Sequence, residues 1–282
     1  RNHFLWGADA YFDNHQDRAF NDQTNFDHAA LATAALHDAN IRLGYDIPLA
    51  RMRHTGPEFH QAQIPNLTLG QRPPLVSFKG NIFHMPQIWW HHRYVAYEYW
   101  EQHPDIFCDI TCPSTNRFKA RNKKYDTPRN AFAALMLNAT FAFTPGGGSF
   151  NSFRFAEALG LGAIPVVTSE FVPPLVPEID WTGCLVQVSE ARIIDIPRIL
   201  RQISEEEVIA RQKRCRYLFD TTVGWAPDKE GSGWSLDRTR SLTMALLIWQ
   251  QRIENYHRFK QQGEAVLEMG SSSKSNPPPN QS

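Results

Sequence analysis

Apolar segments of strand length alternate with segments of helix length between residues 75 and 220. Residues 163–168, for example, carry Ile164, Val166 and Val167, and helix-like segments stand on both sides of them. Strands that alternate with helices in this way form a parallel sheet with helices covering both faces. The chain is therefore expected to have an α/β fold.

The individual elements follow from the spacing of apolar residues and from the glycines and prolines that break regular structure. Strands are predicted at residues 4–7, 75–78, 140–144, 163–168 and 184–188. Helices are predicted at residues 27–36, with Asp27 as N-cap, and at 93–103, 129–137, 149–161, 196–203, 205–219 and 239–259. A proline-rich linker is expected over 56–74, and the low-complexity sequence from 270 onward is expected to be disordered.

The composition argues against two classes of protein. Lys and Arg together number 29, as do Asp and Glu, so the formal net charge is zero, whereas a non-specific nucleic-acid binder normally has a basic excess. No run of 18 or more apolar residues occurs in the sequence, so it contains no candidate membrane span.

The four cysteines are too few for a disulfide scaffold in a chain of 282 residues. Cys108 and Cys112 have the spacing of zinc ligands, but no second Cys/His pair stands nearby, so free thiols or a local disulfide are the simpler interpretations. Asn66 and Asn138 begin Asn-x-Ser/Thr sequons, which fit a secretory protein.

A glycine-rich turn, residues 146–149 (Gly-Gly-Gly-Ser), stands between a predicted strand and a predicted helix and is a candidate phosphate-binding site. Glycines at a helix start let backbone N–H groups approach a phosphate, and the helix dipole adds partial positive charge there. Arg154 can clamp a diphosphate, and Glu157, three residues further on, can accept hydrogen bonds from ribose hydroxyls. The same residues can instead form a surface ion pair beside an ordinary loop, and spacing alone leaves both interpretations open.

Two known phosphate-binding patterns do not match this turn. No Lys-Ser/Thr follows the glycines, as a P-loop requires, and the dinucleotide pattern Gly-x-Gly-x-x-Gly is absent.

Residues 138–169, which read Asn-Ala-Thr-Phe-Ala-Phe-Thr-Pro-Gly-Gly-Gly-Ser-Phe-Asn-Ser-Phe-Arg-Phe-Ala-Glu-Ala-Leu-Gly-Leu-Gly-Ala-Ile-Pro-Val-Val-Thr-Ser, resemble the signature segment of the exostosin family. The family pattern is approximately Phe-Cys-Leu-x-Pro-x-Gly, then Ser-x-Arg-Phe-x-Glu-Ala-Leu, then Ile-Pro-Val-Val-x-Ser. The likeness continues at residues 178–181 and 196–203, and shorter matches occur in order at 1–3, 45–48 and 78–80.

The resemblance implies a GT-B fold, in which two Rossmann-like domains face a cleft. Residues 1–70 would be part of the N-terminal, acceptor-side domain, which would be incomplete here. Residues 71–260 would form the C-terminal domain, which binds the UDP-sugar and ends in a crossing helix. Residues 261–282 would be a disordered tail.

The resemblance also implies an activity: inverting transfer of a sugar from a UDP-sugar to a glycan or glycoprotein acceptor. The residues that would surround the diphosphate are Lys79, Gly148, Ser149, Ser152 and Arg154, and Glu157 would bind the ribose. Donors of hydrogen bonds and cations would stabilise the leaving UDP, so neither a metal nor another cofactor is expected.

The family context further implies lumenal residence in the Golgi, with a membrane anchor upstream of Arg1, and a paired family subunit as one partner. An alternative is a non-catalytic partner subunit, because residues 146–148 replace a turn that often contains arginines in the family. A third interpretation is a nucleotide-binding or lectin-like module unrelated to sugar transfer. Phe141-Ala142-Phe143 also lacks a cysteine that family members often carry, so the disulfide made by that cysteine would be absent.

Inversion requires a base that takes the proton of the acceptor hydroxyl. Asp46 lies in a segment, residues 45–48, that should face the cleft, and the simpler alternative is that it is a loop-capping residue. Further candidates that the sequence does not rank are His3, Asp9, Asp13 and His54. The histidines His84, His91 and His92 are expected to have surface or packing roles.

Overall fold

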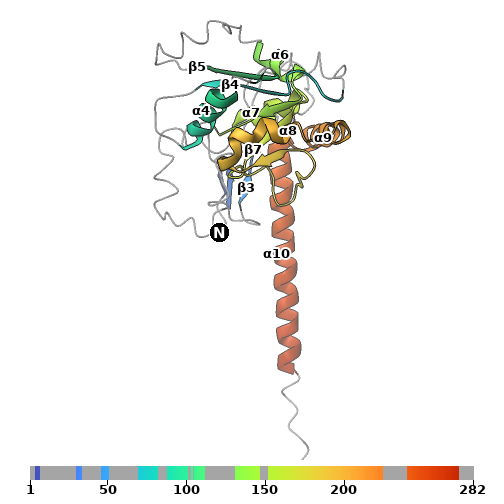
Figure 1. The fold of residues 1–282 in the computed structure, drawn as a ribbon. Coiled ribbons are helices and arrows are strands. Elements are labelled where there is room, and N and C mark those ends of the chain that lie inside the picture. Colours follow the sequence, from blue (N-terminus) through green and yellow to red (C-terminus); the bar gives the residue numbers. More distant parts are fainter. Residues whose placement is uncertain are drawn as a thin grey trace, which may run out of the picture.

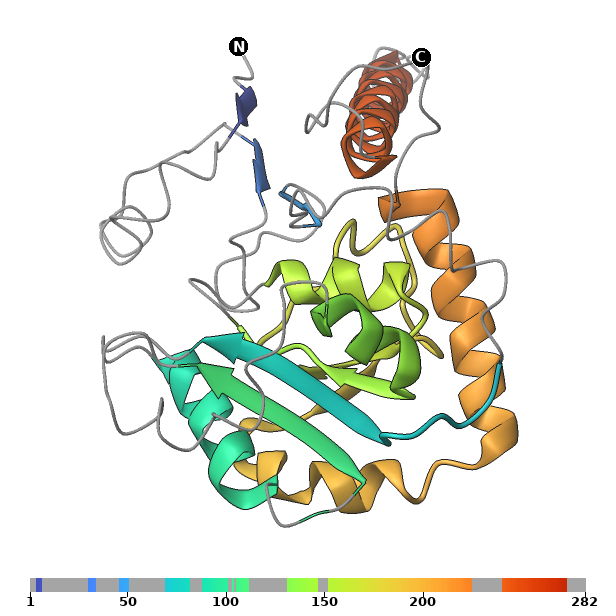
Figure 2. The same cartoon turned by 90° about the horizontal axis from the view of Figure 1, so that it is seen from above.

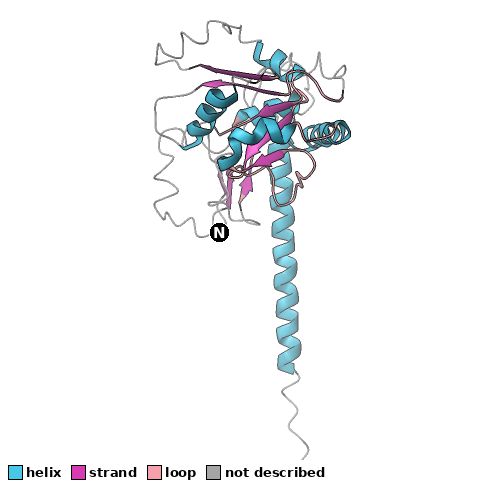
Figure 3. Ribbon diagram, in the orientation of Figure 1, coloured by secondary structure: helices cyan, strands magenta, loops and turns pink. Residues whose placement is uncertain are grey.

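The computed structural model of the protein describes residues 4–6, 30–33, 46–50, 69–81, 88–100, 103, 105–111, 131–146, 152–224 and 240–272 (Figure 1). Within these ranges the chain forms two parallel sheets and a set of helices (Figure 3). The α/β class with parallel sheets is confirmed.

The larger sheet has five strands in the order β5-β4-β6-β7-β8, and every neighbouring pair is parallel. Its strands are β4 (Val76–Asn81), β5 (Ile106–Thr111), β6 (Phe141–Phe143), β7 (Ile164–Thr168) and β8 (Val186–Val188). Val76 of β4 pairs with Ile106 of β5 on one side and with Phe141 of β6 on the other. From β4 the chain continues to β5 at one edge of the sheet, whereas from β6 it continues through β7 to β8 at the other edge. The strand order therefore reverses between these two central strands.

Helices cover both faces of this sheet, and the alternation of side chains along the strands shows which helix packs where. Phe141 and Phe143 pack with α4 (Ile88–Trp100) and α8 (Ile196–Leu200), whereas Ala142 between them packs with α6 (Ala131–Asn138) and α7 (Phe153–Gly160). Figure 2 shows α4 and α7 on either side of the strands. The rings of Phe143 and Trp100 lie 5.0 Å apart edge to face, an arrangement that aromatic pairs prefer.

The 3₁₀ helix η3 (Glu190–Asp195) leads from β8 into α8, and α9 (Glu205–Leu218) follows along the β8 side of the sheet. A π-helical turn, η4 (Phe219–Val223), then connects α9 to the region before α10. Helix α9 begins at the N-cap Ser204, whose hydroxyl accepts a hydrogen bond from the backbone of Glu207.

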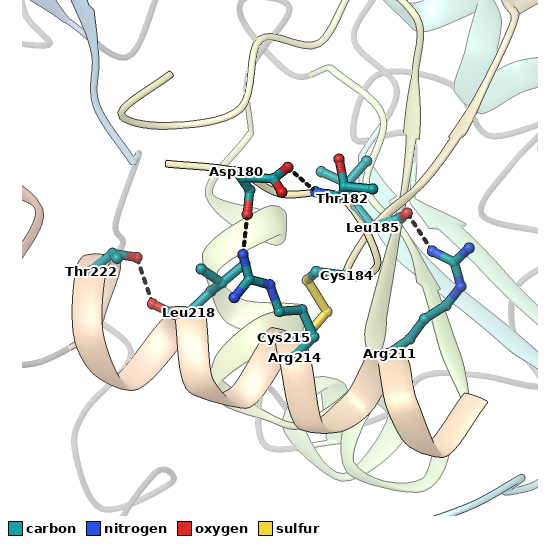
Figure 4. The surroundings of a disulfide bond; sticks show 9 residues. All are labelled: Asp180, Thr182, Cys184, Leu185, Arg211, Arg214, Cys215, Leu218 and Thr222. Atoms are coloured by element: carbon teal, nitrogen blue, oxygen red, sulfur yellow. Dashed lines mark hydrogen bonds between the residues drawn. A yellow bond between two sulfur atoms is a disulfide. The ribbon is translucent and has the colours of Figure 1, made fainter. Parts of the chain in front are cut away.

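A disulfide joins Cys184, just before β8, to Cys215 on α9, with 4.7 Å between their Cα atoms (Figure 4). Arg211 and Arg214 reinforce the same junction by donating to the carbonyls of Leu185 and Asp180. The sequence did not predict this bond, because the two cysteines are separated by 31 positions and no local spacing relates them.

Helix α10 (Arg240–Ser272) is 33 residues long, and its first part packs on the core through Ala245 and Ile248. The helix then extends away from the sheets (Figure 1), and Tyr256 and Phe259 are 66% and 73% exposed. The predicted end at 259 was too early, and residues 261–272 of the expected disordered tail are helical. The helix prediction used a stripe of apolar residues, and this part of the sequence has none. It is helical because Gln, Glu, Ala, Leu and Met have high helix propensity.

The smaller sheet has the order β1-β2-β3, with β1 (Phe4–Trp6), β2 (Ala30–Thr33) and β3 (Ile47–Pro48) all parallel. The predicted helix over 27–36 was wrong for its centre, because residues 30–33 form the middle strand. Alanine and leucine are strong helix formers, but intrinsic propensity is worth well under about 1 kcal/mol per residue, and pairing with two neighbouring strands overrides it here. Asp27, its expected N-cap, lies outside the described residues.

The two sheets contribute to one apolar core. Ala32 and Ile47 of the small sheet pack in the same cluster as Phe155 and Leu159 of α7 and as Ala245 of α10. Among the helices that the structure describes, none has a stretch long and apolar enough to cross a membrane.

Candidate functional site

The reversal of strand order between β4 and β6 marks the place where a ligand site is expected. In open parallel sheets, ligands bind beyond the carboxyl ends of the strands at such a reversal. Gly80 lies near the carboxyl end of β4, Gly146 follows β6, and α7 begins nearby at Phe153. The residues that the sequence singled out come from these same elements.

Ser152 is the N-cap of α7. Its backbone is extended, with φ −140° and ψ 142°, and its hydroxyl oxygen accepts a hydrogen bond from the Arg154 N–H at 3.3 Å. This cap starts the helix at Phe153 and points the partial positive end of α7 toward the carboxyl ends of β4 and β6.

Arg154 and Glu157 share one face of α7, as the spacing predicted. The Nη1 group of Arg154 donates to Oε2 of Glu157, and its Nε donates to the Lys79 carbonyl of β4 at 3.1 Å. The side chains are only 14% and 5% exposed, so this is not the surface ion pair that the sequence left open. The pair instead lies largely enclosed between α7 and β4.

Lys79 is half-buried near the end of β4, and its neighbour Phe78 faces the α4 side of the sheet. Alternation along the strand therefore places the Lys79 side chain on the α7 side, and the Lys79 carbonyl accepts the hydrogen bond from Arg154. Of the predicted set, Lys79, Ser152, Arg154 and Glu157 are brought together, whereas Gly148 and Ser149 lie outside the described residues.

Arg93 of α4 reaches the same strand ends from the other face, and sequence analysis missed it. Its Nε and Nη2 groups donate to the Gly146 carbonyl at 3.0 and 2.7 Å, and the residue is 6% exposed. Burial, with a further contribution from the nearby charge of Arg154, lowers the pKa of Arg93 to about 10. The side chain therefore remains cationic at neutral pH.

Asp46 directly precedes β3 of the smaller sheet. It is fully buried, and its carbonyl accepts a hydrogen bond at 3.2 Å from Arg252 of α10, which also forms a bidentate pair with Glu178. The contacts that the structure describes thus tie Asp46 to α10. Its role as base stays a prediction, and the other candidate bases, listed here, lie outside the described ranges: His3, Asp9, Asp13 and His54.

A second polar group lies just past the ends of β7 and β8. The hydroxyl of Ser169 donates to the Glu190 carboxylate at 2.5 Å, and the Glu170 N–H donates to it at 3.2 Å. Burial tends to raise the pKa of Glu190, but these hydrogen bonds and the charge of His92 outweigh it and leave the pKa lowered. His92 of α4 is buried, in agreement with a packing role, whereas His91 is exposed.

In the described ranges, no three His, Cys, Asp or Glu side chains are grouped so that they could hold a metal ion. Cys112 and residues 82–87 lie outside those ranges, so the zinc-like spacing of Cys108 and Cys112 is not tested.

Comparison with solved structures finds glycosyltransferases with distant similarity. WaaG, a glycosyltransferase involved in lipopolysaccharide biosynthesis, is 13% identical, with a TM-score of 0.43 over 78% of this chain and 70% of its own. The C-terminal domain of LpcC, a glycosyl transferase group 1 family protein from Francisella tularensis, is 12% identical, with a TM-score of 0.33 over 61% and 95% of the two chains. These scores are too low to relate the arrangement of the whole chain to either protein.

Similarity in sequence is more specific. Exostosin-1 of Drosophila melanogaster is 34% identical over 110 residues, which is 39% of this chain and 14% of that protein. An exostosin-1 homolog of Caenorhabditis elegans is 28% identical over 243 residues, which is 78% of this chain and 60% of that protein. The chain thus spans less than two thirds of both relatives.

A model of the exostosin GT47 domain matches residues 1–203, which is well over half of the 282 residues. The chain therefore belongs to the exostosin-type glycosyltransferase family.

Proposed function

We propose that this protein is an inverting glycosyltransferase that moves a sugar from a UDP-sugar to a glycan or glycoprotein acceptor. The observation that carries the proposal is the enclosed Arg154–Glu157 pair at the start of α7, beside the reversal of strand order. Family membership supports the reaction class, and the geometry of this pair supports the nucleotide as its ligand.

Each member of the pair suits one part of the donor. The guanidinium of Arg154 and the positive end of α7 favour the diphosphate, and Ser152 can donate its hydroxyl. The carboxylate of Glu157 is unsuited to phosphate but suited to ribose hydroxyls, which donate hydrogen bonds to it. Held by Arg154, the carboxylate is already oriented before a nucleotide arrives.

In the proposed reaction, the acceptor hydroxyl attacks the anomeric carbon from the side opposite to UDP. A new carbon–oxygen bond forms, the bond to the β-phosphate oxygen breaks, and that oxygen leaves with the electron pair as UDP. Arg154 and Lys79 stabilise the charge that develops on UDP. The acceptor proton passes to a base, proposed to be Asp46, whose buried carboxylate would have to become accessible to the acceptor.

An oxidising compartment fits this function. The Cys184–Cys215 bond is of a kind that persists in secreted and lumenal proteins and is rare in the cytosol. Together with the sequons at Asn66 and Asn138, it supports the proposal that the domain works on the lumenal side of Golgi membranes, held there by an anchor and paired with a family subunit.

The test is calorimetric titration of UDP into the full-length protein in EDTA, beside the variant Glu157→Ala. We expect micromolar binding without metal, weakened at least about tenfold in Glu157→Ala, because a hydrogen-bonded charged partner of the ribose is lost. Glu207→Ala is the control, because Glu207 also pairs with an arginine on its own helix, Arg211 of α9, but is more exposed and lies outside the proposed site.

Unchanged UDP affinity in Glu157→Ala would contradict the proposed site. If UDP binds as expected, turnover with a panel of UDP-sugars separates the enzyme from the alternative of a non-catalytic partner subunit. Binding without turnover in the presence of its partner subunit would favour that alternative.

A further inference from the structure

Arg93 approaches the candidate site from the face of the sheet opposite to Arg154. It belongs to α4, which packs on Phe78, Phe141 and Phe143, whereas Arg154 belongs to α7 on the other face. Two of its nitrogen atoms donate to a single carbonyl, that of Gly146, at 3.0 and 2.7 Å. Gly146 stands where the chain leaves β6 on its way to α7, so Arg93 holds the strand end that precedes the proposed donor site.

The space around Arg93 is closely fitted. Its guanidinium carbon lies 5.7 Å from the centre of the Phe78 ring. A Cβ on Gly80 would lie 2.8 Å from Cζ of Phe78 and 3.4 Å from Nη1 of Arg93, so the missing side chain at Gly80 makes room for both. The buried guanidinium of Arg93 thus lies beside Phe78 and Gly80 near the end of β4 and contacts the Gly146 carbonyl after β6.

A buried arginine at position 93 would destabilise the fold if its only role were to fill the space beside Phe78 and Gly80. Removing a guanidinium from water is costly even when its N–H groups are bonded, and the nearby charge of Arg154 adds repulsion. Two cations beside the same strand ends are favourable, however, when a polyanion binds there. The arrangement is therefore better matched to a diphosphate-binding site than to core packing.

We propose that Arg93 is a positioning residue of the donor site. By holding the Gly146 carbonyl it fixes the end of β6 from which the chain continues to α7, and its charge adds to that of Arg154 in attracting a diphosphate. This inference rests on the proposed function, which supplies the ligand. It concerns how Arg93 affects binding of the diphosphate part of UDP and not binding of the nucleoside.

The test compares Arg93→Gln and Arg93→Lys with the unchanged protein, using UDP, inorganic pyrophosphate and uridine as separate probes. Arg72→Gln is the matched control. Arg72 is also partly buried, donates to two backbone carbonyls, those of Leu137 and Gly162, and has a pKa lowered to about 10 by burial. It lies at the opposite edge of the sheet, where β4 and β7 begin.

In folded Arg93→Gln we expect the affinity for UDP and for pyrophosphate to fall by about tenfold or more, while millimolar binding of uridine is retained. Arg93→Lys should recover part of the loss, because it keeps the charge but not the two-nitrogen contact. Arg72→Gln should lower the melting temperature and leave all three affinities unchanged.

Affinities for UDP and pyrophosphate within twofold of the unchanged protein would overturn the inference, as would equal losses for UDP and uridine. Should Arg93→Gln not fold, Arg93→Lys and Gly80→Ala carry the same comparison. If the unchanged protein binds pyrophosphate but not UDP, the nucleotide proposal fails while the role of Arg93 is still decided by the pyrophosphate titration. Binding of neither would overturn both.

Discussion

Arg154 and Glu157 show what residue spacing can and cannot predict. Positions three apart on a helix share a face, so their contact follows from the sequence once the helix is recognised. Their enclosure does not, because it depends on β4, whose Lys79 carbonyl lies more than seventy positions earlier in the chain. Arg93 was missed for the same reason, since the carbonyl that it binds belongs to a distant turn.

His92 gives a prediction at this scale. It is 2% exposed, and its Nδ1 atom has no hydrogen-bond partner in the described part of the chain. Burial lowers its pKa, the charge of Glu190 opposes this shift, and that of His91 adds to it. The folded protein therefore binds the proton less readily than the unfolded chain, whose histidine pKa is near 6.5.

The lowered pKa of His92 determines how the stability of the protein changes with pH. Above pH 6.5 the residue is neutral in both states and has no effect on the pH dependence, whereas below it the unfolded chain takes up more protons and stability falls. We expect urea midpoints to decrease from pH 7.5 to 5.5, and this decrease to be smaller in His92→Gln but unchanged in the control His257→Gln, because His257 is exposed on α10. An identical decrease in all three proteins would show that His92 is not responsible.

Elements were predicted best where the apolar pattern was strong and local. Strand β7 was expected at 163–168 and is found at Ile164–Thr168, and α9 was expected at 205–219 and is found at Glu205–Leu218. Strand β5 was not predicted, and β2 was mistaken for a helix. Both are stabilised by pairing with strands far away in the sequence, which no local pattern reports.

The disulfide gives a prediction at the scale of elements. It closes a loop that contains β8, η3, α8 and most of α9, because the two cysteines are 31 positions apart. A loop of this length restricts the unfolded chain, so its loss should lower the free energy of unfolding by about 3–4 kcal/mol. The double variant Cys184→Ala/Cys215→Ala should show this loss in urea denaturation.

Reductant provides the control, because it should destabilise the unchanged protein by a similar amount and leave the double variant unaffected. If reductant destabilises both equally, the effect comes from other cysteines. A double variant as stable as the unchanged protein would contradict the stabilising role of the bond.

At the scale of the whole molecule, the central arrangement is a parallel sheet whose strand order reverses beside the start of α7. The sequence predicted the α/β class and the strand–turn–helix unit because alternation and glycine signals are local. It could not predict how α10 is held. Arg252 joins that helix to Glu178 and to the Asp46 carbonyl, and this contact unites three segments of the chain.

Hydrogen exchange with and without UDP tests the central claim most directly, because it locates the ligand on the whole chain. We expect saturating UDP to slow exchange in peptides that cover the end of β4 and the first turn of α7, while peptides from α10 are unchanged. Such a pattern would place the nucleotide at the reversal between β4 and β6. Protection confined to α10 and β3, or no protection at the start of α7 in a protein that binds UDP, would contradict the account.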